Sequence, residues 1–388
     1  MKKIIIVNNN MKVGGVQISL RNLLWEIRDQ YDITLYLFDG NGILMDQIPP
    51  EVKVRLCKGP FRYFGISQGE CKGLDVWKRG VLAAACRVFG RTAVVKWMLR
   101  SQEKLPEAYD CAIAYLQNGR ESNFYGGVQD FVAHCVNASR KVAFMHGDYS
   151  RCGANEQQNH QLLQQFDRIA ACSDGCRDAF RQTVPELENR CVTVRNCHRF
   201  SQIRSLADEM PVQYPSDPVN AVMVARLTHE KGIERAIEAV SFAGSRGLPV
   251  ALHIVGGGPM KDTLSQKAKE LGVQAQVFFY GEQANPYRYM KHADLLLISS
   301  FHEAAPMVIG EAACLGIPTL TVETTSSREM VIAERCGWVC DNHQQALNEM
   351  LARVVSDRQL LEAVREELRN RSFHNELAKS QFSCLIEE

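Results

Sequence analysis

The chain has 388 residues, of which 46% are hydrophobic and 23% are charged, and its formal net charge is +1. This composition is typical of a folded globular protein and excludes a disordered one, and the length predicts about two domains. The near-zero charge gives no overall reason to expect nucleic acid as a partner.

The chain starts with MKKIIIVNNN, residues 1–10. Its four consecutive apolar residues are fewer than the roughly seven of a signal peptide, so we expect a buried strand. No stretch approaches the roughly 18 uncharged apolar residues of a membrane span, so an integral membrane protein is not expected. Fourteen cysteines without a Cys-x-x-Cys pair favour reduced thiols in a cytoplasmic protein.

Short apolar runs rich in β-branched residues alternate with amphipathic segments along the whole chain. Such runs suit parallel strands that helices cover on both faces. They occupy residues 2–8, 32–38, 110–116, 141–146 and 167–173 in the first half, and residues 220–226, 250–256, 275–281, 293–300 and 317–322 in the second. We therefore predict an α/β fold of two doubly wound, Rossmann-like domains that face each other across a cleft. Ligands of such domains bind at the carboxyl ends of the strands, and the cleft is the expected active site.

Residues 58–104 form a basic segment, with ten Lys and Arg against three acidic residues, a local charge of +7. Within it, residues 74–100 are apolar on one side, with cations interspersed and with Trp77 and Trp97 near the ends. Two interpretations remain open. The segment is either an interfacial helix on an anionic membrane surface or a basic helix packed on the N-terminal sheet.

Three prolines, at positions 211, 215 and 218, separate the two halves. They favour extended, poorly packed backbone, so we place the domain boundary there. The predicted domains are residues 1–212 and 213–373, and residues 374–388 are a final segment that could pack back on the N-terminal domain.

Two cations follow the first strand of the second half. Arg226 ends the strand and Lys231 stands at the start of a helix. Positive side chains beside a helix N-terminus suit a diphosphate. After the next strand come Gly256 and two more glycines, which would let a ligand or another backbone approach closely.

Residues 301–316, FHEAAPMVIGEAACLG, place Glu303 in the turn after a buried strand and Glu311 on the following helix, which Pro306 is suited to begin. The amides at that helix start, at Ala305, Met307 and Val308, can hold phosphate oxygens. Carboxylates accept hydrogen bonds from sugar hydroxyls, so the two glutamates would bind the two sugars of a nucleotide-sugar.

Together, RLTHEKG, IVGGGP and the stretch from residue 278 to 323 resemble the C-terminal domain of retaining glycosyltransferases of family 4, which have the GT-B fold and a Glu-x7-Glu motif. The resemblance extends into the first half through MKVGGVQISLRNLL, MHGDYS and ACSDGCRDAF. It implies that Arg226 and Lys231 neutralise the donor diphosphate, that Glu303 orients the transferred sugar and that Glu311 binds the ribose.

The resemblance also implies roles for the first half. Gly14 and Gly15 would let the first loop approach donor phosphate and acceptor, and His146 would stand at the reacting sugar. Transfer would retain configuration and need neither a metal nor another cofactor. Two alanines, at 304 and 305, follow Glu303 where the family often has Gly-Phe. This departure leaves the identity of the donor sugar open.

The expected function is transfer of a hexose or N-acetylhexosamine from a nucleoside-diphosphate sugar, most simply a UDP-sugar, to a glycan acceptor. A lipid-linked acceptor in bacterial surface polysaccharide synthesis, capsule or lipopolysaccharide, would agree with the basic segment and with a cytoplasmic or peripheral membrane location. Two alternatives remain: a sugar-nucleotide epimerase of similar fold, which would act with no acceptor present, and a sugar-nucleotide binding protein without turnover.

Overall fold

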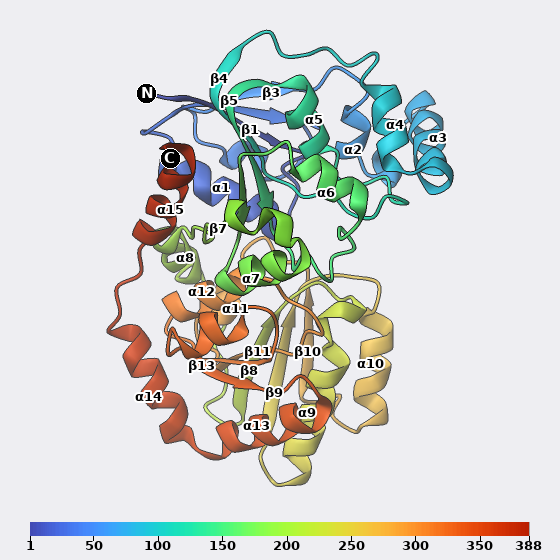
Figure 1. The fold of residues 1–388 in the computed structure, drawn as a ribbon. Helices are drawn as coiled ribbons and strands as arrows, with labels where there is room; N and C mark the ends of the chain where they lie inside the picture. Colours follow the sequence, from blue (N-terminus) through green and yellow to red (C-terminus); the bar gives the residue numbers. More distant parts are fainter. Residues whose placement is uncertain (388) are drawn as a thin grey trace. The chain divides into compact units, whose positions relative to one another are not determined.

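The computed structural model describes residues 1–387, with every side chain of that range except that of Gln68. The chain forms two compact units (Figure 1). The N-terminal unit is Met1–Cys197 together with the last segment of the chain, from Asn375. The C-terminal unit is His198–His374, and the three prolines of residues 211–218 lie within it.

The N-terminal unit is built on a parallel sheet, which within the described residues has the strand order β3-β2-β1-β4-β5-β6-β7. Its strands are β1 (Lys3–Asn8), β2 (Asp32–Leu37), β3 (Lys53–Leu56), β4 (Ala108–Ala114), β5 (Asn137–Met145), β6 (Arg168–Ala171) and β7 (Cys191–Thr193). Its helices are α1 (Gly15–Ile27), α2 (Arg62–Gly65), α3 (Leu74–Phe89), α4 (Arg91–Met98), α5 (Val128–Cys135), α6 (Gln157–Leu163), α7 (Asp174–Thr183) and α15 (Glu376–Glu387), with 3₁₀ turns η1 (Met45–Gln47), η2 (Gln68–Glu70) and η3 (Pro185–Arg190).

The core of the N-terminal unit joins the two ends of the chain. Ile4 and Ile6 of β1 are fully buried and pack in one cluster with the apolar face of α1. The same cluster contains Phe382 and Leu385 of α15, which is the red helix beside α1 in Figure 1. Burial of these side chains fixes the last helix on the first sheet.

The C-terminal unit has a second parallel sheet, ordered β10-β9-β8-β11-β12-β13 in the part of the chain described. Its strands are β8 (Val219–Val224), β9 (Val250–Val255), β10 (Val277–Gly281), β11 (Leu295–Ile298), β12 (Thr319–Val322) and β13 (Gly337–Cys340). Its helices are α8 (Phe200–Ala207), α9 (Ile233–Ser245), α10 (Lys261–Glu270), α11 (Tyr287–Met290), α12 (Met307–Cys314), α13 (Gln344–Ser356) and α14 (Arg358–Arg369), with a 3₁₀ turn η4 (His229–Lys231) and a π-helical turn η5 (Arg328–Ile332).

Helices cover both faces of this second sheet. Ala221 and Met223 of β8 belong to the core cluster that contains α9, α10 and α13, whereas Val222 between them belongs to the cluster that contains α12. Successive side chains of a strand point to opposite faces, so a strand buried on both sides reads as an unbroken apolar run. This pattern confirms the predicted doubly wound α/β fold.

All ten apolar runs that the sequence analysis identified form strands. The sequence analysis missed β3, β7 and β13, and each of them lies at an edge of its sheet. In β3 most side chains are exposed, β7 has three residues and β13 has four. An edge strand is short and incompletely covered, which removes the apolar signal of a central strand.

Residues 74–100 of the basic segment form two helices, α3 and α4, instead of one. They separate at Gly90, whose φ of 82° is in the region that favours glycine and ends α3. The expectation of a single helix over residues 74–100 was therefore wrong, because Gly90 ends α3 before α4 begins.

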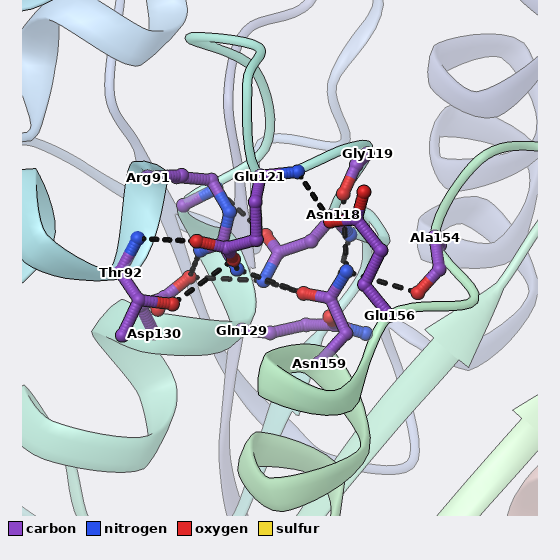
Figure 2. Close-up of polar contacts among 11 residues, drawn as sticks. Arg91, Thr92, Asn118, Gly119, Glu121, Gln129, Asp130, Ala154, Glu156 and Asn159 are labelled. Atoms are coloured by element: carbon purple, nitrogen blue, oxygen red, sulfur yellow. Dashed lines mark hydrogen bonds and ion pairs between the residues drawn. The ribbon is translucent and has the colours of Figure 1, made fainter. Parts of the chain in front are cut away.

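A buried polar network attaches α4 to the rest of the N-terminal unit (Figure 2). Arg91 is fully buried, and its guanidinium donates to Glu121 at 2.8 Å and to Asn159 at 2.7 Å and also pairs with Asp130. The Glu121 carboxylate accepts from the amide of Thr92 at 2.8 Å. A buried guanidinium needs such partners, because an unpaired buried charge is strongly destabilising.

Candidate functional site

The carboxyl ends of β9, β8 and β11 bring together three of the loops that the sequence analysis singled out. After β8 the chain continues to β9 on one side of it, whereas β11 lies on the other side. The direction of the strand order therefore reverses between β8 and β11. Such a reversal leaves a crevice at the carboxyl ends of the strands, and ligands of open α/β sheets bind there.

The loop after β8 is bonded to the loop after β11. Ser299 Oγ donates to the carbonyl of Gly232 at 2.7 Å, and the amide of Phe301 donates to the carbonyl of Glu230 at 2.9 Å. Gly232 has a φ of 57°, and a Cβ there would lie 2.3 Å from the Ser299 carbonyl oxygen. Only glycine lets the two backbones come this close.

Lys231 and Glu303 form an ion pair across this junction. Lys231 Nζ lies 2.7 Å from Glu303 Oε1, and Ser300 Oγ donates to the same oxygen at 2.7 Å. The two charged side chains are 22% and 13% exposed, so water screens the pair only in part. The structure thus brings together one predicted phosphate ligand and one predicted sugar ligand that are far apart in the sequence.

The other two charged residues of the predicted set make separate contacts. Arg226 is 75% exposed, and its guanidinium lies 3.4 Å from Glu230 Oε1. Glu311 is buried on α12, and the hydroxyl of Tyr287 donates to its Oε1 at 3.2 Å. Arg226 therefore lies on the loop after β8, and Glu311 lies on α12.

Helix α12 starts at the end of the β11 loop. Pro306 is its N-cap residue, with an extended ψ of 117°, and Ala305, Met307 and Val308 are half-buried around the helix start. The first amides of a helix have no partner within the helix and lie at the positive end of its dipole. The first turn of α12 carries no acidic side chain that would compete for them. The sequence-predicted helix from Pro306 to about Leu315 agrees closely with the observed one.

The glycines after β9 pack against another part of the backbone. Gly256 has a φ of 147°, and a Cβ there would lie 1.9 Å from the Ala225 carbonyl oxygen. A Cβ on Gly258 would lie 2.5 Å from the Leu227 carbonyl oxygen. These glycines hold the β9 loop against the β8 loop, which positions the segment that carries Arg226.

Gly14, Gly15 and His146 lie in the N-terminal unit, after the carboxyl ends of β1 and β5. Gly14 is the N-cap residue of α1, and a Cβ on Gly15 would meet nothing within 4 Å. The His146 ring packs beside Tyr115, with ring centroids 4.6 Å apart. Burial lowers the pKa of His146 to about 4, so the imidazole is neutral at pH 7.

Sequence reasoning missed the residues that orient the two glutamates. Ser300 ends the run that was read as a strand and could have been identified from its place just before Glu303. No sequence pattern marks Tyr287 as a partner of Glu311, because their contact depends on the packing of α11 against α12. Arg235 was also missed; it donates to the Ser299 carbonyl at 3.2 Å and supports the β11 loop from α9.

In residues 1–387, no three His, Cys, Asp or Glu side chains gather in a way that could hold a metal ion. No helix in the same range is both long and apolar enough to cross a membrane.

Comparison with known proteins relates the C-terminal unit to glycosyltransferases. Residues 208–371 match the family model described as glycosyl transferases group 1. A putative colanic acid biosynthesis glycosyltransferase, WcaL of Escherichia coli K12, is 30% identical over 151 residues, which are 37% of this chain and 37% of WcaL. The lipopolysaccharide glucosyltransferase WaaG of the same organism is 30% identical over 142 residues, which are 36% of this chain and 38% of WaaG. The matches thus span less than half of the length of these relatives.

Solved structures resemble the chain over its whole length. HepE of Anabaena, in complex with UDP and glucose, has a TM-score of 0.67 and 18% identity and covers 100% of this chain and 98% of its own. TarM of S. aureus, in a complex that contains UDP, has a TM-score of 0.70 and 14% identity and covers 100% of both chains. This likeness establishes the GT-B fold. With the family match, it supports a glycosyltransferase family for the protein.

Proposed function

We propose that the protein is a glycosyltransferase that transfers a sugar from a nucleoside-diphosphate sugar to a glycan in the synthesis of a bacterial surface polysaccharide. The observation that carries the proposal is the ion pair of Lys231 and Glu303, with Nζ and Oε1 2.7 Å apart, at the strand-order reversal. We infer from this pair a crevice lined by a cation, a carboxylate and the start of helix α12. A diphosphate is bound by the cation and by the amides at the start of the helix, and a sugar with free hydroxyls is bound by the carboxylate.

The leaving diphosphate is the group that must be stabilised. The ammonium of Lys231 has three donors, of which Glu303 takes one, so the others are available to phosphate oxygens. The amides of Ala305, Met307 and Val308 would bind the remaining oxygens, and Arg226 would add a second positive charge. Fixed donors of this kind stabilise the negative charge that develops as the sugar leaves. We propose that they do so with no essential metal and no other cofactor.

The two glutamates would position the sugars of the donor. Both described hydrogen bonds to Glu303 reach Oε1, which leaves Oε2 to accept from a hydroxyl of the transferred sugar. Glu311, oriented by Tyr287, would accept from the ribose diol. In the N-terminal unit, Gly14, Gly15 and the neutral His146 are the candidate contacts to donor sugar and acceptor. We propose that transfer retains the configuration of the sugar, as in family 4.

The comparisons support a UDP-sugar as donor, because the similar structures of HepE and TarM contain UDP. The names of WcaL and WaaG point to surface polysaccharides, colanic acid and lipopolysaccharide. We therefore propose a hexose or N-acetylhexosamine as the transferred sugar and a lipid-linked glycan as the acceptor. The protein would then work in the cytoplasm, at the inner face of the plasma membrane.

A screen of UDP-, GDP- and ADP-sugars tests the donor. Nucleotide-sugars with one of the three bases should raise the thermal unfolding midpoint of the protein in a concentration-dependent way, because a ligand that binds only the folded state stabilises it. The stabilising donor, labelled in its sugar, should then pass the label to a lipid-extractable glycan from bacterial membranes. Conversion of the donor with no acceptor present would instead indicate an epimerase, and stabilisation with no transfer to any acceptor would indicate a binding protein.

A further inference from the structure

A groove lies between α3 and α4 on the N-terminal unit, with a volume of about 700 Å³. Pockets of this size hold small molecules or segments of larger ones. Its lining is almost entirely apolar and includes Trp77, Leu82, Phe89, Val94 and Trp97. The candidate donor residues lie on other elements, so the groove is separate from the candidate donor site.

The rim of the groove exposes large apolar side chains to solvent. Trp77 is 68% exposed, Phe89 is 73% exposed and Trp97 is 59% exposed. Leu74 and Val88 of α3 are 76% and 73% exposed. Isolated exposed apolar residues are common, but a contiguous group around a groove marks an interaction surface.

Cations occur on the same two helices that carry this apolar surface. Lys78 lines the groove, and the side chains of Arg87, Lys96 and Arg100 are exposed on or beside the same two helices. Asp75, the one acidic residue of α3, pairs with Arg62 at 2.7 Å. Exposed aromatic residues beside Lys and Arg are typical of a surface that lies on anionic lipid. In a symmetric contact with a second copy, the same cations would face each other, which disfavours that occupant.

The groove is a fixed feature of the unit. Arg91, the first residue of α4, is held by Glu121 between β4 and α5, by Asp130 of α5 and by Asn159 of α6 (Figure 2). The amide of Arg91 also donates to the Glu121 carbonyl at 2.7 Å. Because α4 is anchored at its first residue, the two helices keep a defined cavity between them.

We propose that this groove takes up a hydrocarbon chain of an anionic membrane phospholipid, while the surrounding cations contact the lipid phosphates. The choice of a membrane as partner rests on the proposed lipid-linked acceptor. Binding to vesicles needs neither donor nor transfer, so its failure would leave the transferase proposal intact.

The full-length protein should float with vesicles of phosphatidylcholine that contain phosphatidylglycerol, and not with vesicles of phosphatidylcholine alone. Phe89→Glu should weaken this binding by about tenfold or more, because an exposed apolar side chain proposed to insert into the lipid becomes charged. Leu56→Glu is the matched control, since Leu56 is 50% exposed on β3, outside the groove, and the change in charge is the same. Equal loss in both variants would overturn the proposal, as would equal binding to both kinds of vesicle.

A second variant separates the groove from the surface around it. Ala85 lines the groove, so Ala85→Phe should fill it and leave the exposed aromatic residues and the cations in place. Lipids with spin labels on their chains should quench the tryptophan fluorescence of the wild type and much less that of Ala85→Phe. Undiminished quenching in Ala85→Phe would show that the chain does not enter the groove. A dimer that Phe89→Glu dissociates, without any vesicle binding, would assign the surface to a second copy and overturn the proposal.

Discussion

At the scale of single residues, the chemistry of the candidate site depends on the ion pair between Lys231 and Glu303. Their facing atoms are 2.7 Å apart although the residues are 72 positions apart in the chain. Each side chain fixes the other, and Ser300 fixes the carboxylate further at 2.7 Å. A donor sugar would therefore meet groups that are already oriented, which lowers the entropy cost of reaching the transition state.

Glu303→Gln should reduce transfer and spare binding of the nucleotide. The amide keeps the size of the side chain but loses the charge that the proposed mechanism places at the sugar, so kcat/KM for transfer should fall by about 100-fold or more. The Kd for UDP should change by no more than about threefold. Glu270→Gln, at an exposed position of α10, is the control. Unchanged transfer by Glu303→Gln would remove this residue from the proposed site.

His253 shows how a single buried side chain makes stability depend on pH. It is 4% exposed on β9, with its ring nitrogens 3.0 Å from the Tyr280 hydroxyl and 3.1 Å from Asn220 Oδ1. Burial lowers the pKa of His253 to about 4, against about 6.5 for an unfolded chain. Burial has the same effect on His146 and His198.

The unfolded state therefore binds more protons than the folded state between about pH 6.5 and pH 4, and stability should fall as the pH is lowered through this range. His253 alone should account for at most about 3 kcal/mol of the free energy of unfolding. Denaturant unfolding at a series of pH values measures this dependence of the free energy of unfolding on pH. His253→Gln should flatten the slope, whereas His374→Gln, at an exposed position, should not. The same slope in wild type and His253→Gln would contradict this assignment.

At the scale of elements, tight backbone contacts between loops position the candidate site. Gly232 joins the β8 loop to the β11 loop, and Gly256 joins the β9 loop to the β8 loop. These contacts place backbone atoms where any Cβ would collide. The three loops therefore form one support for the residues proposed to bind the donor.

Gly256→Ala should destabilise the C-terminal unit by about 3 kcal/mol or more, because the new Cβ would lie 1.9 Å from the Ala225 carbonyl oxygen and φ is 147°. Gly244→Ala is the matched control. It lies in α9, where the nearest atom to a Cβ is 3.9 Å away, so it should stabilise by about 0.5–1 kcal/mol. Thermal unfolding measures both variants. A neutral Gly256→Ala would show that the two loops are not held in this way.

The network around Arg91 gives a second prediction at this scale. Arg91→Ala should lower the free energy of unfolding by about 3–5 kcal/mol, because it leaves the carboxylates of Glu121 and Asp130 without their cation in a buried place. Arg87→Ala removes the same charge from an exposed position of α3 and should change stability by about 0.5 kcal/mol or less. Similar effects of the two substitutions would mean that the network does not anchor α4.

At the scale of the whole molecule, the sequence predicted the central strands and the doubly wound fold but missed three of the edge strands, β3, β7 and β13. A run such as residues 295–298 is buried on both faces and is recognisable from its composition alone. β3 has mostly exposed side chains, and it becomes a strand because β2 offers it a free edge. Such pairing depends on distant residues, which a local pattern does not contain.

The candidate site was predictable to a similar degree. Lys231, Glu303 and the start of α12 follow strand ends, so a reading of the strands places them at one edge of the sheet. That Lys231 and Glu303 form a pair, and that Tyr287 and Ser300 orient the two glutamates, could not be predicted. These contacts depend on side-chain conformations that spacing in the sequence does not determine.

Calorimetric titration of UDP into the wild-type protein and Lys231→Ala tests the central claim most directly, with Lys269→Ala of α10 as control. A charge-assisted hydrogen bond to phosphate contributes about 1.5–3 kcal/mol, so Lys231→Ala should weaken UDP binding by about 10- to 100-fold and Lys269→Ala should leave it unchanged. Equal affinity of the wild type and Lys231→Ala for UDP would contradict the assignment of this crevice to the donor diphosphate.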